Sequence, residues 1–73
     1  MRVLYQNQDT PLELYRCRHS GRFEYNLTDA AQKARWLVRN GHATNAVVMD
    51  GEQVKAQWIR RGTETIKISG PDL

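Results

Sequence analysis

Residues 28–41 read TDAAQKARWLVRNG and predict a complete amphipathic helix with its own start and stop. At about 100° per residue, the apolar side chains of this stretch fall on one stripe. The stripe consists of Ala30, Ala31, Ala34, Leu37 and Val38. Thr28 is the expected N-cap, and Gly41 is the expected left-handed terminator. We therefore expect a helix from about Asp29 to Asn40, which can lie close against a sheet because its stripe is rich in alanine.

The opposite side of this helix is polar and basic apart from one tryptophan. Trp36 falls roughly 160° from the middle of the apolar stripe, so its indole is predicted to project away from the core. The other residues on this side are Gln32, Lys33, Arg35, Arg39 and Asn40. An exposed indole among cations can stack on a nucleic-acid base while the cations hold phosphates. It can equally be the centre of a protein interface, or pack beneath a loop such as residues 7–11.

Strand and turn signals alternate at short intervals before the helix. A first strand is expected around Arg2–Gln6, followed by a hairpin with arms near Leu12–Arg18 and Arg22–Leu27. The hairpin should turn at residues 19–21, with Gly21 in the left-handed conformation after a type I turn.

This turn is expected to fix which side chains of the first hairpin face the core. The alternative two-residue loop would bury two guanidinium groups without partners, which costs several kcal/mol each. The bulged turn instead places Arg16 on the outer face, opposite Glu24. The inner face then carries Tyr15, Cys17, Phe23, Tyr25 and Leu27.

A second hairpin and a final strand are expected after the helix. The hairpin arms lie near Thr44–Met49 and Glu52–Arg60, with Asp50-Gly51 as a two-residue turn. The last strand, Glu64–Ser69, should return beside the long arm. Val54, Ala56 and Trp58 are expected to share one face of that arm. The register that pairs apolar side chains places Trp58 opposite Ile66, Ala56 opposite Ile68 and Arg60 opposite Glu64.

The predicted architecture is an α+β domain with the order β-β-β-α-β-β-β, antiparallel hairpins and one helix packed on one face of the sheet. We expect a single domain over residues 1–69 and a tail over residues 70–73. One helix covers only one face of such a sheet, so the other face must curl closed, stay polar or meet a second copy.

Length and composition exclude several classes of protein. With 73 residues and 8.5 kDa, the chain has room for one small domain and little room for a deep catalytic pocket. No stretch approaches the roughly 18 apolar residues of a membrane helix. The only cysteine, Cys17, cannot form an intrachain disulfide, which favours the reducing cytoplasm.

Residues with catalytic chemistry are few and scattered. His19 and His42 are both expected in turns, and Cys17 with His19 is a weak signal for a nucleophile and base. One cysteine and two histidines do not form a metal-ligand set. The five glycines are explained by turns, a cap and the tail rather than by a phosphate-binding loop. We therefore expect neither an enzyme nor a cofactor or metal site.

The charge balance fits an anionic partner and equally fits an ordinary domain whose surplus of positive charge serves solubility alone. Lys and Arg number 11 against 8 Asp and Glu, which gives a net charge of +3 and a pI near 9.4. Most of the cations are arginine, whose guanidinium group suits phosphate and carboxylate recognition. Arg60-Arg61 forms a secondary basic cluster at a predicted hairpin turn.

The sequence thus predicts a small basic binding module that contacts nucleic acid through the polar helix face. In this hypothesis Trp36 stacks and Lys33, Arg35 and Arg39 contact phosphates, with Gln32 and Asn40 at the margin. The alternative is a small regulatory or inhibitory protein that docks on an acidic surface of a larger protein through the same residues. A homodimer formed through this face is a further interpretation.

Overall fold

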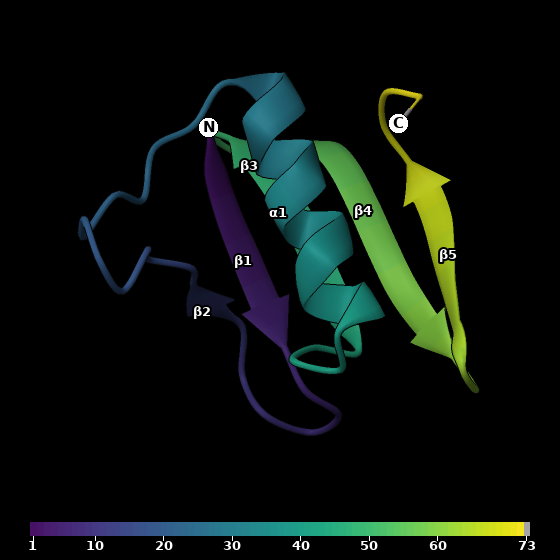
Figure 1. The fold of residues 1–73 in the computed structure, drawn as a ribbon. Coiled ribbons are helices and arrows are strands. Elements are labelled where there is room, and N and C mark those ends of the chain that lie inside the picture. The colour runs from purple at the N-terminus through teal and green to yellow at the C-terminus, as the bar shows by residue number, and fades with distance from the viewer. Residues whose placement is uncertain (73) are drawn as a thin grey trace.

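The computed structural model describes residues 1–72 as one antiparallel sheet with a single helix on one face. The elements are β1 (Arg2–Gln6), β2 (Glu13–Leu14), α1 (Leu27–Arg39), β3 (Asn45–Asp50), β4 (Gln53–Arg61) and β5 (Glu64–Ser69). The strands lie side by side in the order β2-β1-β3-β4-β5, and α1 lies in front of the middle of the sheet, over β3 and between β1 and β4 (Figure 1). The predicted α+β class, with its one helix packed on an antiparallel sheet, is confirmed.

The first hairpin forms less regular structure than predicted. The arm expected over residues 22–27 is not a strand, and β2 is only two residues long. The turn is closed by hydrogen bonds from Gly21 N to the Cys17 carbonyl and from Cys17 N to the Arg22 carbonyl. Beyond it the chain leaves the hairpin, because Tyr25 N donates to the carbonyl of Met1 instead. The sheet therefore has five strands rather than six.

The side chains of this hairpin alternate only partly as expected. Tyr25 is buried and Cys17 is partly buried, while Arg16 is exposed. Phe23, which was expected on the inner face, is only partly buried and is not part of the core. The prediction that Arg16 faces Glu24 is wrong. The turn contains one residue more than expected, so Arg16 lies over the Phe23 ring, with its guanidinium carbon 4.5 Å from the ring centroid.

Glu24 has different partners, both from the start of the chain. Its carboxylate accepts hydrogen bonds from Arg2 Nε at 2.7 Å and from the N-terminal ammonium of Met1 at 3.2 Å. These two positive groups lower the pKa of Glu24, mainly through the hydrogen bond from Arg2. They attach the loop before the helix to the first strand.

The helix begins two residues earlier than predicted. Asn26, not Thr28, is the N-cap, and its Oδ1 accepts a hydrogen bond from Asp29 N at 2.8 Å. The predicted end is confirmed, since Gly41 follows the helix with a φ of 80° and donates to the Val38 carbonyl. The left-handed conformation explains why glycine is required at this position.

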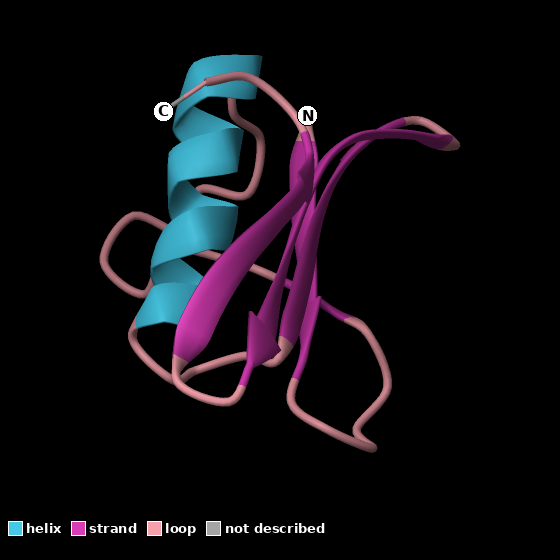
Figure 2. Ribbon diagram, turned by 90° about the vertical axis from the view of Figure 1, so that its right-hand side faces the viewer, coloured by secondary structure: helices cyan, strands magenta, loops and turns pink. Residues whose placement is uncertain are grey.

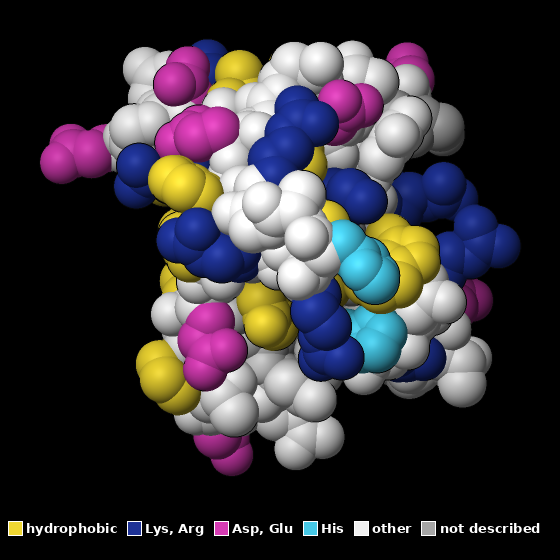
Figure 3. All heavy atoms as spheres, turned by 60° about the vertical axis from the view of Figure 1, so that its left-hand side comes forward, with side chains coloured by type: hydrophobic (Ala, Val, Ile, Leu, Met, Phe, Trp, Pro, Cys, Tyr) yellow, Lys and Arg dark blue, Asp and Glu magenta, His cyan; other side chains and the backbone are white. Residues whose placement is uncertain are grey.

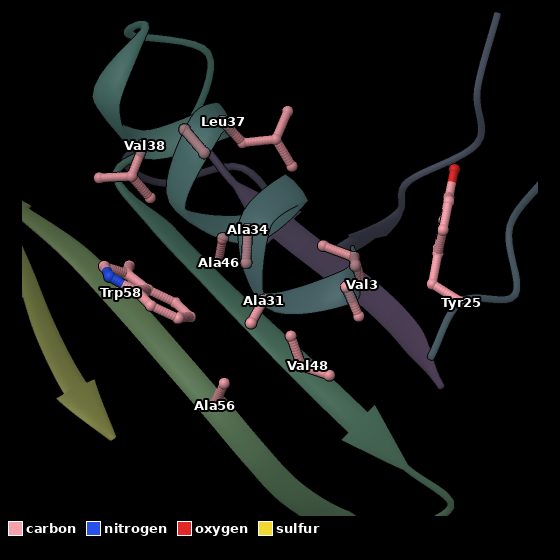
Figure 4. Packing of buried hydrophobic residues seen from close by; sticks show 12 residues of the cluster. Val3, Tyr25, Ala31, Ala34, Leu37, Val38, Ala46, Val48, Ala56 and Trp58 are labelled. Atoms are coloured by element: carbon pink, nitrogen blue, oxygen red, sulfur yellow. The ribbon is translucent and has the colours of Figure 1, made fainter. Parts of the chain in front are cut away.

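The predicted apolar stripe of α1 forms one half of the core. Its five residues are all buried, and they pack against side chains from β1, β3 and β4 (Figure 4). The sheet contributes Val3, Ala46, Val48, Ala56 and Trp58 to this core. Trp58 is only 2% exposed and fills the space beside the small alanines of the helix.

The second hairpin turns one residue later than expected. Asp50 pairs with Gln53, so the two turn residues are Gly51 and Glu52. A β-bulge between Val48 and Met49 then shifts the register of the pair. As a result Val54 lies opposite Met49 and is 52% exposed, instead of sharing the buried face with Ala56 and Trp58.

The pairing of β4 with β5 also differs by one residue from the prediction. Gly62 and Thr63 form the turn, which brings Arg61 rather than Arg60 opposite Glu64. Ile66 consequently pairs with Ile59, and Trp58 pairs with Lys67. A slip of one residue moves a side chain to the other face of a sheet, so Ile66 lies on the face away from α1.

Among residues 1–72 no second layer covers that other face (Figure 2). The segment after β5 returns on the helix side, where Gly70 lies against Ala56. Lys67 Nζ binds Asp72 Oδ1 at 3.1 Å. Leu73, the last residue of the predicted tail, lies outside the described residues, and the boundary at residue 69 stays a prediction. Within residues 1–72 the structure contains no helix long and apolar enough to cross a membrane.

Candidate functional site

Trp36 lies on the surface of α1 and is 48% exposed, in agreement with its position on the helical wheel. One face of its indole is covered by His42, whose ring stacks at a centroid distance of 4.9 Å and an angle of 24°. The turn after the helix holds this histidine, because His42 N donates to the Leu37 carbonyl. Asn40 Nδ2 also donates to the Trp36 carbonyl. The covering group is therefore His42 and not the loop over residues 7–11.

Two shallow, open depressions adjoin Trp36. One, of about 450 Å³, lies toward the end of the helix and is lined by Tyr5, Tyr15, Arg16, Arg18, Trp36, Leu37 and His42. The other, of about 580 Å³, lies toward its start and is lined by Tyr15, Cys17, Arg18, His19, Gln32, Lys33 and Trp36. Both are bounded by the irregular first hairpin, which packs beside the helix. Trp36, Arg18 and Tyr15 belong to both depressions and form the ridge between them.

The structure brings together only part of the predicted site. Gln32 and Lys33 lie beside Trp36, and Arg39 is exposed on the last turn of α1. Arg35 lies elsewhere, in a depression lined by Trp58, Thr65, Lys67 and Asp72. One residue along a helix is a rotation of about 100°, which turns Arg35 from Trp36 toward β5.

Other residues at this site were not predicted from the sequence. We call the following set the Trp36 surface: Tyr15, Arg16, Arg18, His19, Gln32, Lys33, Trp36, Arg39 and His42. The outward direction of Arg16 and Arg18 could be predicted, because burial of either guanidinium group would be costly. Their position beside the helix could not, since it depends on how the first hairpin packs.

The Trp36 surface is positive, and its described cations have no carboxylate partner, although Arg16 Nη1 donates to the Gly21 carbonyl at 3.0 Å. In the described part of the chain, the ion pairs join Glu24 to Arg2 and to the N-terminus, and Lys67 to Asp72. Among residues 1–72, no carboxylate therefore lies within 4.0 Å of the four cations of this surface, which are Arg16, Arg18, Lys33 and Arg39. In Figure 3 the two histidines lie beside a hydrophobic patch with Lys and Arg side chains around them.

Cys17 lines the depression at the start of α1, beside the Trp36 surface, and has an acidic thiol. Its pKa is lowered to about 7, chiefly by the hydrogen bond from the Ser20 side chain, with further contributions from the backbone of Ser20 and His19. About half of the thiol is therefore ionised near neutral pH, which raises its reactivity toward electrophiles.

The secondary basic cluster is divided by the structure. Arg60 donates from Nη1 to the Val38 carbonyl at 3.3 Å and from Nε to the Gly62 carbonyl at 3.2 Å. It therefore stabilises the C-terminal end of α1, where a cation is favourable. Arg61, the next residue of the strand, is exposed and points to the other face of the sheet.

Residues 1–72 bring together no three His, Cys, Asp or Glu side chains in a group that could hold a metal ion. The comparisons with known proteins add no further constraint, because no family model, curated protein or solved structure matches this chain. The geometry and charge of the Trp36 surface are thus the basis for any functional assignment.

Proposed function

We propose that this protein is a non-catalytic module that binds single-stranded nucleic acid through the Trp36 surface. The observation that supports this most strongly is an exposed indole on a ridge between two depressions, each lined by cations without acidic partners. Aromatic stacking on unpaired bases, combined with cations along the backbone, is the general mode of sequence-tolerant single-strand binding.

The geometry supports a distinct role for each part of the surface. His42 occupies one face of the indole, so a base would stack on the other face, extending the existing aromatic pair. Arg18 adjoins both depressions, while Lys33 lies in one of them and Arg16 in the other. Phosphates on either side of the stacked base would therefore each meet a cation. The depressions are open, which suits a continuous strand better than a small enclosed ligand.

The experiment is fluorescence anisotropy with a labelled single-stranded oligonucleotide of mixed sequence. Stacking on an aromatic side chain is worth about 1–3 kcal/mol per base, so Trp36→Ala is expected to weaken binding at least fivefold. Ile68→Ala is the matched control, since Ile68 is 53% exposed and lies away from the Trp36 surface. Circular dichroism should show that both variants keep the fold.

Two results would contradict the proposal. One is the absence of binding by the unchanged protein at low salt. The other is equal affinity of the Trp36→Ala and Ile68→Ala variants. A lysate pull-down with nuclease treatment tests the alternative, because a partner retained after digestion would support docking on an acidic protein surface instead.

A further inference from the structure

We propose that the sheet face opposite α1 is an interface with a second copy of this chain. The side of the sheet that α1 does not cover is apolar across all five strands. We call this the open sheet face; its apolar members are Leu4, Leu14, Val47, Met49, Val54, Ile59 and Ile66. They follow from the strand registers, in which Leu14 pairs with Leu4, Leu4 with Val47, and Ile59 with Ile66. Val54 is 52% exposed, Val47 only 8%, and the other five are half-buried, so the face presents a partly exposed apolar surface. Contiguous apolar surface on a folded chain is typical of an interaction site.

The polar residues of the open sheet face bind one another. Gln57 Nε2 donates to Asn45 Oδ1 at 2.9 Å, and Asn45 Nδ2 donates to Gln6 Oε1 at 2.8 Å. These three amide side chains lie on β1, β3 and β4, and they form part of their hydrogen bonds with one another. A covering layer would therefore remove few unpaired polar groups from water. The charged residues of this face are Arg2, Lys55, Arg61 and Glu64. Arg2, Arg61 and Glu64 lie at the ends of their strands, and Lys55 lies beside the bulge between β3 and β4.

The area of the face is close to the lower limit for a specific dimer. The five strands have 5, 2, 6, 9 and 6 residues, which at about 3.3 Å per residue and about 4.8 Å between strands present roughly 440 Å² per copy. Two such faces in contact bury about 900 Å², just below the ~1,000 Å² of a stable specific interface, so the expected dimer is a weak one.

A second copy is the partner whose chemistry fits this face. Apart from Lys55 near the bulge, the middle of the face has apolar residues and neutral amides, so the partner needs no charge there, and an identical face meets that condition. A two-fold axis allows the same patch to serve both copies, and two sheets can pack face to face about 10 Å apart. The face also has a hollow of about 470 Å³ at one end, whose apolar lining is Met1, Leu4, Leu14 and Met49 and whose rim includes the charged residues Arg2, Glu24 and Asp50. A copy offers exposed apolar side chains to fill it, since Leu12 and Val54 are 48% and 52% exposed.

Such a dimer would have two sheets inside and two helices outside. The Trp36 surface lies on the helix side, so both copies of it would stay accessible and face in opposite directions. The proposed interface is therefore separate from the nucleic-acid surface, and the two proposals can fail independently.

Sedimentation equilibrium over a concentration range of about 5 to 300 µM tests the interface. We expect the average molecular mass in solution to rise with protein concentration, from the 8.5 kDa of one chain toward twice that value. Ile66→Lys places a charge in the open sheet face and is expected to weaken association at least tenfold. Thr63→Lys adds the same charge at the exposed β4–β5 turn, and its average molecular mass should depend on concentration as that of the wild-type protein does.

A second variant tests the interface independently of whether Ile66→Lys folds. Val54 is already exposed, so Val54→Lys should keep the native circular dichroism spectrum and still weaken the dimer. A wild-type chain that stays monomeric up to 300 µM would overturn the proposal. A dimer that persists in the folded Val54→Lys and Ile66→Lys variants would also overturn it, because the copies would then meet through an edge strand or the helix.

Discussion

Trp36 illustrates how the angular position of a residue on a helix determines its surroundings. It lies two residues from Ala34 and next to Leu37, which are both buried, yet it remains half exposed. Arg35, its other neighbour along the chain, points to a different depression near β5. The helical wheel predicted the exposure of Trp36 but not the neighbours that complete the surface. Those neighbours are Arg16, Arg18 and His42, which come from segments on either side of the helix in sequence.

At the same scale, the hydrogen bonds around Cys17 predict an acidic thiol. The pH profile of alkylation by iodoacetamide should have its midpoint at about pH 7, against about 8.5 for a free cysteine. Since the Ser20 hydroxyl is the main cause, Ser20→Ala should move the midpoint upward. Denatured protein serves as the reference for the unperturbed thiol. A native midpoint equal to the denatured one would show that the thiolate is not stabilised by the turn.

At the scale of elements, the sequence predicted the kind of regular segments better than their exact turns. The periodicity of α1 depends on many residues and was predicted correctly. The alternation of β4 was predicted correctly for Ala56 and Trp58 but not for Val54, which the bulge turns outward. The turns at Gly21, Gly51 and Gly62 were each displaced by one residue. In every case glycine was correctly expected in the turn, but the number of residues beside it depends on how the two arms pack. The displacement at Gly62 had the largest effect, because it placed Ile66 on the open sheet face.

The start of α1 provides a direct test at this scale. Asn26→Ala removes the side chain that accepts the hydrogen bond from Asp29 N and should lower the free energy of unfolding by about 1 kcal/mol. Thr28 lies inside the helix and is exposed, so Thr28→Ala should change stability by only a few tenths of a kcal/mol. Urea denaturation of the two variants gives the comparison. A larger loss for Thr28→Ala than for Asn26→Ala would mean that the helix begins where the sequence pattern alone placed it.

At the scale of the whole molecule, the single helix divides the sheet into two unlike faces. One face forms the core with α1, and the hairpin before the helix packs at its side to create the Trp36 surface. The other face is apolar and has no covering layer within the described chain. The sequence predicted that one helix would leave a face uncovered, but the apolar character of that face depends on the bulge at Met49 and on the register of β5. Local pattern could not specify either feature, because both arise from pairing between strands.

The salt dependence of nucleic-acid affinity tests the central proposal most directly. Contacts from Arg16, Arg18, Lys33 and Arg39 to four phosphates of a single strand predict a loss of roughly 50-fold in affinity between 50 and 200 mM salt. Arg18→Gln should reduce the slope of the logarithmic plot by about 0.7, while Arg61→Gln on the opposite face should leave it unchanged. Affinity that does not vary with salt, or an equal reduction of the slope in both variants, would contradict binding through the Trp36 surface.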